Sequence, residues 1–185
     1  MGLLTPNQSG LSGLLGQYNK PVKRKAFISY HHDNDQDWYD YISLQYLDTF
    51  DLFYDNSLER KINSTNSEYL NRKIREEYIF GTSVTIVLCG PETWKRRWID
   101  WEIHATLYYS HGLLGVALPS CQKGNEGKYV VPTRLHKNIV SGFAHFIAWD
   151  NDPANFKASI EIAVQNSSYK SLIDNNDVKM KRSTS

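Results

Sequence analysis

Cysteine and long apolar runs are both scarce in this chain. Only two cysteines, Cys89 and Cys121, occur among the 185 residues, and they lack the spacing of metal ligands. Two cysteines are too few for a disulfide framework, so a reducing, cytoplasmic location is the simplest expectation. No stretch approaches the roughly 20 apolar residues that a membrane span requires, so we expect no contact with a membrane.

An excess of charge of one sign is also missing. Lysine and arginine number 21 against 20 acidic residues, which gives a net charge of +1. Such a balance produces no field that would attract nucleic acid, so no nucleic-acid partner is predicted. The first residues lack the basic region and apolar run of a secretory signal, and Pro6 stands where a myristoylation motif requires Ser or Thr. We therefore expect no targeting segment.

The hydrophobic fraction of 41% is sufficient for a core, and the length suits one domain. Residues 1–22 are rich in Gly, Ser, Asn and Leu and are predicted to form a flexible arm. A disordered leader and an arm that docks on a neighbouring protomer both fit that composition. The folded domain is expected over 23–170, and 171–185 is expected to be a flexible, solvated tail.

Short apolar runs alternate with helical periodicity, a pattern typical of a parallel sheet with helices on both faces. The expected strands are residues 25–30, 50–54, 83–89, 112–117 and 143–149. The expected helices are residues 35–47, 67–80, 96–110 and 153–167. Five strands in this length predict a flavodoxin-like, three-layer α/β fold with strand order 2-1-3-4-5. In that order, the ligand crevice lies beyond the carboxyl ends of the first and third strands.

Polar residues follow the first predicted strand, at the expected crevice. Adjacent side chains of His31, His32 and Asp33 would point in opposite directions in an extended segment, so no metal site is predicted there. Neither a GxGxxG nor a Walker sequence occurs. Ordinary dinucleotide redox chemistry and phosphoryl transfer are therefore disfavoured.

The predicted helix over 96–110 carries two stripes of side chains. One is apolar, has four-residue spacing and should be buried on the sheet; it consists of Ile99, Ile103 and Leu107. Trp98 and Glu102, also four residues apart, share an adjacent face near the crevice. Glu102 is thus a candidate catalytic carboxylate. The alternative is that Glu102 pairs with a surface cation such as Arg97 while Trp98 fills the core, and periodicity leaves both open.

Three short segments resemble a known family. Residues 27–30 (FISY), 53–55 (FYD) and 98–103 (WIDWEI) resemble the first strand, the second strand and the Trp-x-x-x-Glu helix of enzymatic TIR domains. The combination of 30–33 (YHHD), 84–88 (VTIVL) and 97–102 (RWIDWE) is similar to the TIR-like proteins of bacterial Thoeris anti-phage defence, the ThsB family. The resemblance extends over about residues 24–168.

This resemblance implies an enzyme, an NAD+ nucleosidase or ADP-ribosyl cyclase, for which NAD+ is the substrate and no cofactor is needed. Nicotinamide is cationic in NAD and leaves as a neutral molecule, so one carboxylate is enough. Glu102 would stabilise the oxocarbenium-like charge at the anomeric carbon, and Trp98 would supply a flat wall. Such an enzyme would hydrolyse NAD or convert it into a cyclic or conjugated ADP-ribose signal.

The family also suggests binding residues and partners. Ser29, Tyr30 and His31 would border the nucleotide, and Asp55 and Ser57 would begin a loop used for substrate gating and self-association. Family enzymes often carry basic residues where this chain has its two histidines. The implied partners are a second protomer, an effector protein activated by the ADP-ribose product, and a phage protein as trigger. Two alternatives are a non-catalytic TIR-like adaptor and a nucleotide-binding module that senses without turnover.

Overall fold

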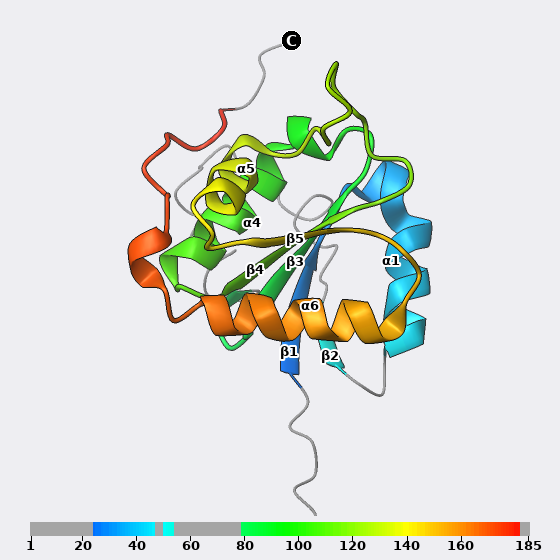
Figure 1. Cartoon of the computed structure of the whole chain (residues 1–185), viewed down its shortest axis with the longest axis horizontal. Helices are drawn as coiled ribbons and strands as arrows, with labels where there is room; N and C mark the ends of the chain where they lie inside the picture. Colours follow the sequence, from blue (N-terminus) through cyan, green and yellow to red (C-terminus); the bar gives the residue numbers. More distant parts are fainter. Residues whose placement is uncertain (1–23, 47–49, 54–78, 182–185) are drawn as a thin grey trace, which may run out of the picture.

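The computed structural model describes residues 24–46, 50–53 and 79–181. Within these ranges lies a five-stranded sheet in the order β2-β1-β3-β4-β5, with every neighbouring pair parallel (Figure 1). The strands are β1 (Arg24–Ser29), β2 (Phe50–Phe53), β3 (Val84–Cys89), β4 (Gly112–Ala117) and β5 (His145–Ala148). This is the strand order that the sequence predicted, so the carboxyl ends of β1 and β3 meet at one edge of the sheet.

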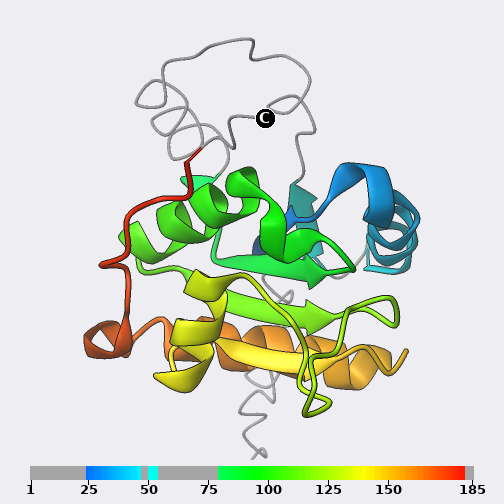
Figure 2. The same cartoon turned by 90° about the horizontal axis from the view of Figure 1, so that it is seen from above.

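Four helices and two short 3-10 turns accompany the sheet in the described ranges. They are α1 (His32–Tyr46), η2 (Thr93–Lys95), α4 (Arg97–Tyr108), α5 (Thr133–Val140), α6 (Pro153–Asn166) and η3 (Lys170–Leu172). Helices α1 and α6 pack in one core cluster, and α4 and α5 pack in another on the opposite face of the sheet (Figures 1 and 2). The α/β class with helices on both faces is thereby confirmed. None of the described helices combines the length and apolar character that a membrane crossing needs.

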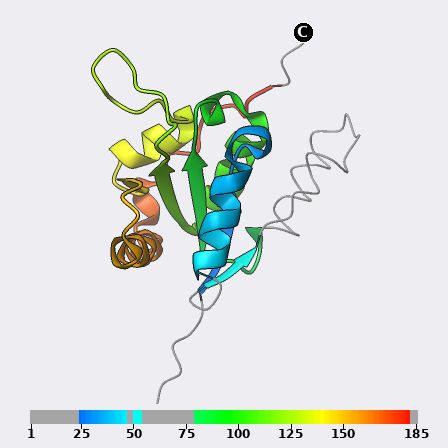
Figure 3. The same ribbon diagram turned by 90° about the vertical axis from the view of Figure 1, so that its right-hand side faces the viewer.

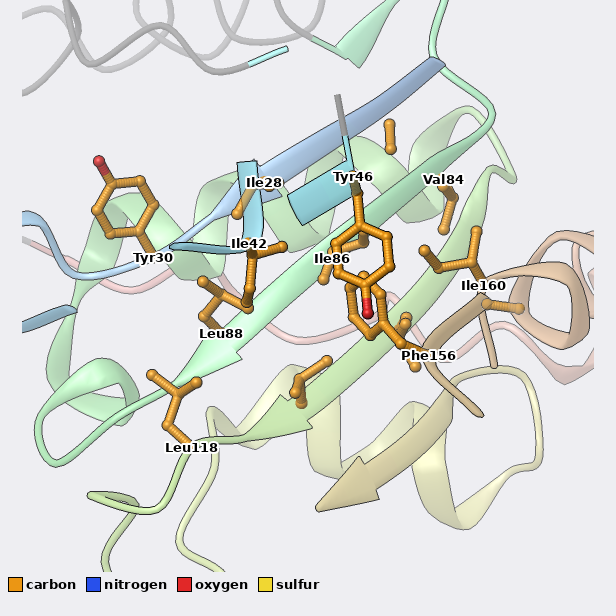
Figure 4. Packing of buried hydrophobic residues seen from close by; sticks show 14 residues of the cluster. Ile28, Tyr30, Ile42, Tyr46, Val84, Ile86, Leu88, Leu118, Phe156 and Ile160 are labelled. Carbon is orange, nitrogen blue, oxygen red and sulfur yellow. The ribbon is translucent and has the colours of Figure 1, made fainter. Parts of the chain in front are cut away.

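The core on the α1 and α6 face is built from alternate residues of the central strands. Ile28 of β1 and Ile86 of β3 lie beneath Ile42 of α1 and Phe156 of α6 (Figure 4). Figure 3 views α6 nearly end-on and shows α1 running close to β1 and β2. All six residues of β3 are buried because helices cover both of its faces.

Helix α4 covers the other face with the predicted apolar stripe. Ile99, Ile103 and Leu107 are each at most 2% exposed and belong to one core cluster with Leu113 of β4. Four-residue spacing places these side chains on one side of the helix, so the helix can bury them together. The same geometry turns Glu102 toward β1 at the edge of this cluster.

Helix α5 lies between the fourth and fifth expected strands, in a segment for which the sequence predicted no helix. Its buried residues include Arg134 and Asn138, and only Leu135 among its apolar residues is fully buried. Arg134 is 2% exposed because its guanidinium donates two hydrogen bonds to Asp100 of α4, at 2.9 and 3.4 Å. The eight residues of α5 carry only two apolar side chains at helical spacing that pack on the core, Leu135 and Ile139, which is too short a pattern to predict a helix from sequence.

Residues 173–181 of the expected solvated tail contact the folded domain in the structure. The Met180 N–H donates to Asp100, its carbonyl accepts a hydrogen bond from the Trp101 indole at 3.0 Å, and Lys137 forms an ion pair with Asp177. Polar contacts hold this segment against α4 and α5, and its composition did not predict them. Three predicted segments lie wholly or partly outside the described ranges: the arm over 1–22, residues 67–78 of the helix expected over 67–80, and residues 182–185 of the tail.

Candidate functional site

The carboxylate of Glu102 is buried where α4 crosses the end of β1. Glu102 is 9% exposed, and its Oε2 accepts a hydrogen bond of 2.6 Å from the Oγ of Ser29. Ser29 is the last residue of β1 and is fully buried. A hydroxyl that donates to a carboxylate forms a short, strong hydrogen bond, so Ser29 fixes the orientation of the Glu102 side chain.

A second polar contact holds the same side of α4 one turn later. Thr106 Oγ1 lies 2.6 Å from Thr85 Oγ1 of β3, and it donates to the Glu102 carbonyl at 2.9 Å. The helix is therefore tied to two neighbouring strands, through Glu102 to β1 and through Thr106 to β3. These contacts fix the rotation of α4 about its axis, and with it the direction of the Glu102 carboxylate.

Trp98 lies one turn before Glu102 on α4 and is half-buried. Its ring meets the ring of Trp101 nearly edge-on at a centroid distance of 5.3 Å. The guanidinium of Arg97 lies 4.7 Å from the Trp98 centroid and 5.7 Å from that of Trp101. Arg97 thus forms cation–π contacts with the two indoles.

Strand alternation separates Ser29 and Tyr30, which the family resemblance placed together beside the nucleotide. Ser29 points toward α4, whereas Tyr30 points into the core on the α1 face. The Tyr30 ring stacks on Tyr39 at 4.8 Å, and its hydroxyl donates to Gln36 at 2.7 Å. The structure therefore brings Ser29, but not Tyr30, to Glu102.

His31 follows at the crevice and is 2% exposed. Burial is the main cause that lowers its pKa, and the nearby charge of Arg96 lowers it further, so the ring is neutral at pH 7. Neither ring nitrogen has a hydrogen-bond partner among the described residues, although Nε2 lies 3.7 Å from Asp33. A buried unpaired imidazole is a feature that requires a structural or functional explanation. Asp55 and Ser57, the loop residues of the predicted site, lie outside the described ranges.

Asp35 is a buried carboxyl group of the crevice that the sequence did not predict. It is fully buried, and burial raises its pKa to about 6. The Thr93 hydroxyl lies 3.5 Å from Asp35 Oδ2 and accepts a hydrogen bond from the Gly90 N–H at 2.8 Å. A Cβ at Gly90 would overlap the carboxyl oxygens of Asp35, so the glycine that follows β3 makes room for this side chain. The lone Gly90 was the available sequence signal, but it does not identify the residue that fills the space.

Comparisons with known proteins place the chain in a family. The model of the Thoeris protein ThsB, TIR-like domain, matches residues 27–123, which is more than half of the chain and contains both Ser29 and Glu102. The TIR domains in the structure of the activated Roq1 resistosome directly recognizing the pathogen effector XopQ are similar at 12% identity and a TM-score of 0.39, covering 88% of this chain and 92% of that one. No curated protein matches the sequence. On the family match, the chain belongs to the TIR-like domains of the Thoeris protein ThsB.

Proposed function

We propose that this protein cleaves the bond between nicotinamide and ribose in NAD, with Glu102 as its catalytic carboxylate. The observation that carries the proposal is the buried Glu102 carboxylate, which Ser29 holds at 2.6 Å beside the carboxyl end of β1. In a doubly wound sheet, this edge is where ligands bind. Membership of the ThsB TIR-like family supports the choice of NAD as substrate.

The chemistry requires one anion in a poorly solvated place. When nicotinamide leaves, positive charge develops at the anomeric carbon of the ribose, and a carboxylate in a low-dielectric site stabilises it strongly. Glu102 meets this requirement because it is nearly buried and its orientation is fixed in advance. The nicotinamide departs as a neutral molecule, so no residue has to protonate it.

Other residues of the crevice have supporting roles in this proposal. Trp98 provides an aromatic wall one turn from Glu102, and His31 provides a neutral ring whose nitrogens can bond a nucleotide. Arg96 lies close enough to His31 to lower its pKa; its Nη2 forms an ion pair with Glu92 at 2.9 Å, while its buried Nε has no partner among the described atoms. We infer that Arg96 supplies the positive charge for the diphosphate that basic residues after Tyr30 supply in family enzymes. Tyr30 itself serves the core.

The product and the partners extend the same proposal. The ADP-ribose cation would be captured by water or by a hydroxyl, and a cyclic or conjugated product would activate a separate effector in anti-phage defence. Residues from a second protomer would complete the site through self-association, with Asp55 and Ser57 in the gating loop. A phage protein would act as the trigger.

The test is to incubate the full-length protein with NAD, with and without lysate from phage-infected cells. Chromatography then measures free nicotinamide and new ADP-ribose species. Glu102→Gln should lower nicotinamide release at least about a hundredfold, because it removes the charge that stabilises the transition state. Its amide oxygen can still accept the Ser29 hydrogen bond, so the fold should be kept, which circular dichroism checks.

Two further variants separate catalysis from structure. Glu126→Gln makes the same chemical change in an exposed loop and should leave nicotinamide release unchanged. Ser29→Ala keeps the Glu102 side chain but removes the hydrogen bond that fixes its orientation. The rate of nicotinamide release should therefore fall. If Glu102→Gln releases nicotinamide as fast as the native protein, Glu102 is not the catalyst. If no nicotinamide appears under either condition, the non-catalytic adaptor becomes the better description.

A further inference from the structure

A pocket of about 620 Å³ opens on the opposite face from Glu102, between α1 and the loops that follow β4 and β5. It is lined by Asp37, Trp38, Tyr41, Pro119, Trp149, Asp150 and Asn151. Figure 1 shows the connection from β5 to α6 passing beside α1, which is where these loop residues lie. The pocket is thus formed at the carboxyl edge of the sheet, but by elements that do not include α4.

Three aromatic rings form the walls. Trp38 lies 5.8 Å from Trp149 and 6.1 Å from Tyr41, and the Tyr41 and Trp149 centroids are 6.2 Å apart. All three pairs are steeply inclined, with interplanar angles between 68° and 85°. Rings set at such angles enclose a corner rather than stack on one another. The face of an aromatic ring attracts cations, and tryptophan does so most strongly.

The charges around the corner are negative. Asp37 and Asp150 are the charged lining residues, and neither lysine nor arginine is among the seven. Hydrogen bonds from the Asp152 N–H and the Asn155 side chain lower the pKa of Asp150, so this carboxylate is ionised at neutral pH. Besides Asp37, helix α1 carries the exposed aspartates Asp33 and Asp40 and no lysine or arginine. Carboxylates beside aromatic faces suit an organic cation.

The rim of the pocket is held in shape by a contact between its two sides. The Tyr41 hydroxyl donates to Asn151 Oδ1 at 2.7 Å, which ties α1 to the loop after β5. Asn151 adopts a positive φ of 61°, a left-handed conformation that asparagine tolerates better than most residues. A pocket that is already assembled loses little entropy when it binds a ligand.

The surface beside the pocket favours a polypeptide as the carrier of the cation. Tyr41 is 42% exposed and Leu44 is 72% exposed, and both lie on the same side of α1 as Asp37 by their spacing of four and seven residues. An exposed apolar stripe that continues from a pocket gives a partner chain more to contact than a free small cation could use. A guanidinium fits flat aromatic walls better than an ammonium, because it is planar and weakly hydrated.

We propose that this pocket binds the guanidinium of an arginine side chain presented by a partner polypeptide. The aromatic corner contacts the faces of the guanidinium, the two carboxylates balance its charge, and Tyr41 and Leu44 contact the residues on either side of the arginine. This site is independent of the proposed NAD chemistry, because Glu102 and α4 lie on the other face of the sheet.

The experiment follows the indole N–H signals of the ¹⁵N-labelled full-length protein by NMR, with Trp38→Phe and Trp149→Phe used for assignment. The probes are a blocked peptide with one central arginine between leucines, the same peptide with neutral citrulline, and free N-acetyl-arginine amide. The arginine peptide should shift the Trp38 and Trp149 signals saturably, and the citrulline peptide should not. Asp37→Asn should weaken binding about three- to tenfold.

Asp40→Asn is the matched control, because it removes a carboxylate from the same helix at an exposed position outside the pocket. Affinity within twofold of the native value is expected for it. Equal binding of the citrulline peptide, or no shift of either indole at millimolar peptide, would overturn the proposal. If N-acetyl-arginine amide binds as tightly as the arginine peptide, the site takes a free cation and the polypeptide partner is refuted.

Discussion

The buried carboxyl group of Asp35 gives a sharp test of the electrostatics at the crevice. Asp35 is fully buried beside Gly90 and Thr93, and desolvation raises its pKa from 3.8 to about 6. Contacts from Thr93 and from the backbone of His31 act in the opposite direction and do not offset the burial. The folded protein therefore favours the neutral form of this side chain.

The size of the effect on stability follows from the size of the Asp35 pKa shift. A change of about two pKa units corresponds to about 3 kcal/mol between the two protonation states. The stabilisation from the neutral form is fully present below pH 3.8, declines as the pH rises, and is lost above the folded-state pKa of about 6. Asp35→Asn keeps the shape without the charge. Its free energy of unfolding relative to the native protein should therefore rise by about 2 to 3 kcal/mol between about pH 4 and pH 7.5.

Urea unfolding at these two pH values, followed by circular dichroism, measures this change. Comparing the two pH values cancels any constant cost of the new amide group, so only the charge contributes to the difference. Asp40→Asn, on the exposed side of the same helix, is the control and should give a much smaller pH-dependent difference. If the difference between Asp35→Asn and the native protein is the same at both pH values, burial does not disfavour ionisation of Asp35.

Three other changes test the packing. Gly90→Ala should destabilise by about 1 to 3 kcal/mol in urea, because its Cβ meets the Asp35 carboxyl group, and Asp35→Ala in the same chain should relieve most of that cost. Arg134→Met should cost about 3 to 5 kcal/mol by leaving Asp100 buried without its cation, and adding Asp100→Leu should recover part of the loss; persistent full loss would contradict this account. Trp101→Phe removes the indole bond to the C-terminal segment, so limited proteolysis should cut that segment faster than in the native protein, and an unchanged rate would refute the contact.

The elements that could be predicted from sequence are those whose buried side chains are apolar. Strand β4 has the predicted limits, Gly112–Ala117, because it is a continuous apolar run with turns close to both ends, at 109–110 and 119–120. The stripe on α4 was predictable for the same reason, since Ile99, Ile103 and Leu107 repeat every four residues. Helix α5 and the C-terminal segment were not, because α5 has only two core-packed apolar residues at helical spacing, Leu135 and Ile139, and the C-terminal segment is held largely by polar contacts. Charged and amide side chains in a sequence usually indicate a solvated segment, and only the structure shows that they are buried against partners.

The same distinction runs through the candidate site. Glu102 was predictable as a candidate because helix spacing puts it near a strand end, and strand alternation would have predicted that Ser29 and Tyr30 point to opposite faces. Asp35 was not predictable, because an aspartate in the first turn of a helix usually faces water and interacts with the helix dipole. Its burial depends on Gly90, which follows β3 and has no side chain. The spacing of one segment shows which face a residue occupies, but whether a carboxyl group there is desolvated depends on a second segment.

Desolvation is also what the proposed chemistry of Glu102 requires. Measuring the desolvation of Asp35 therefore tests whether this edge of the sheet excludes water.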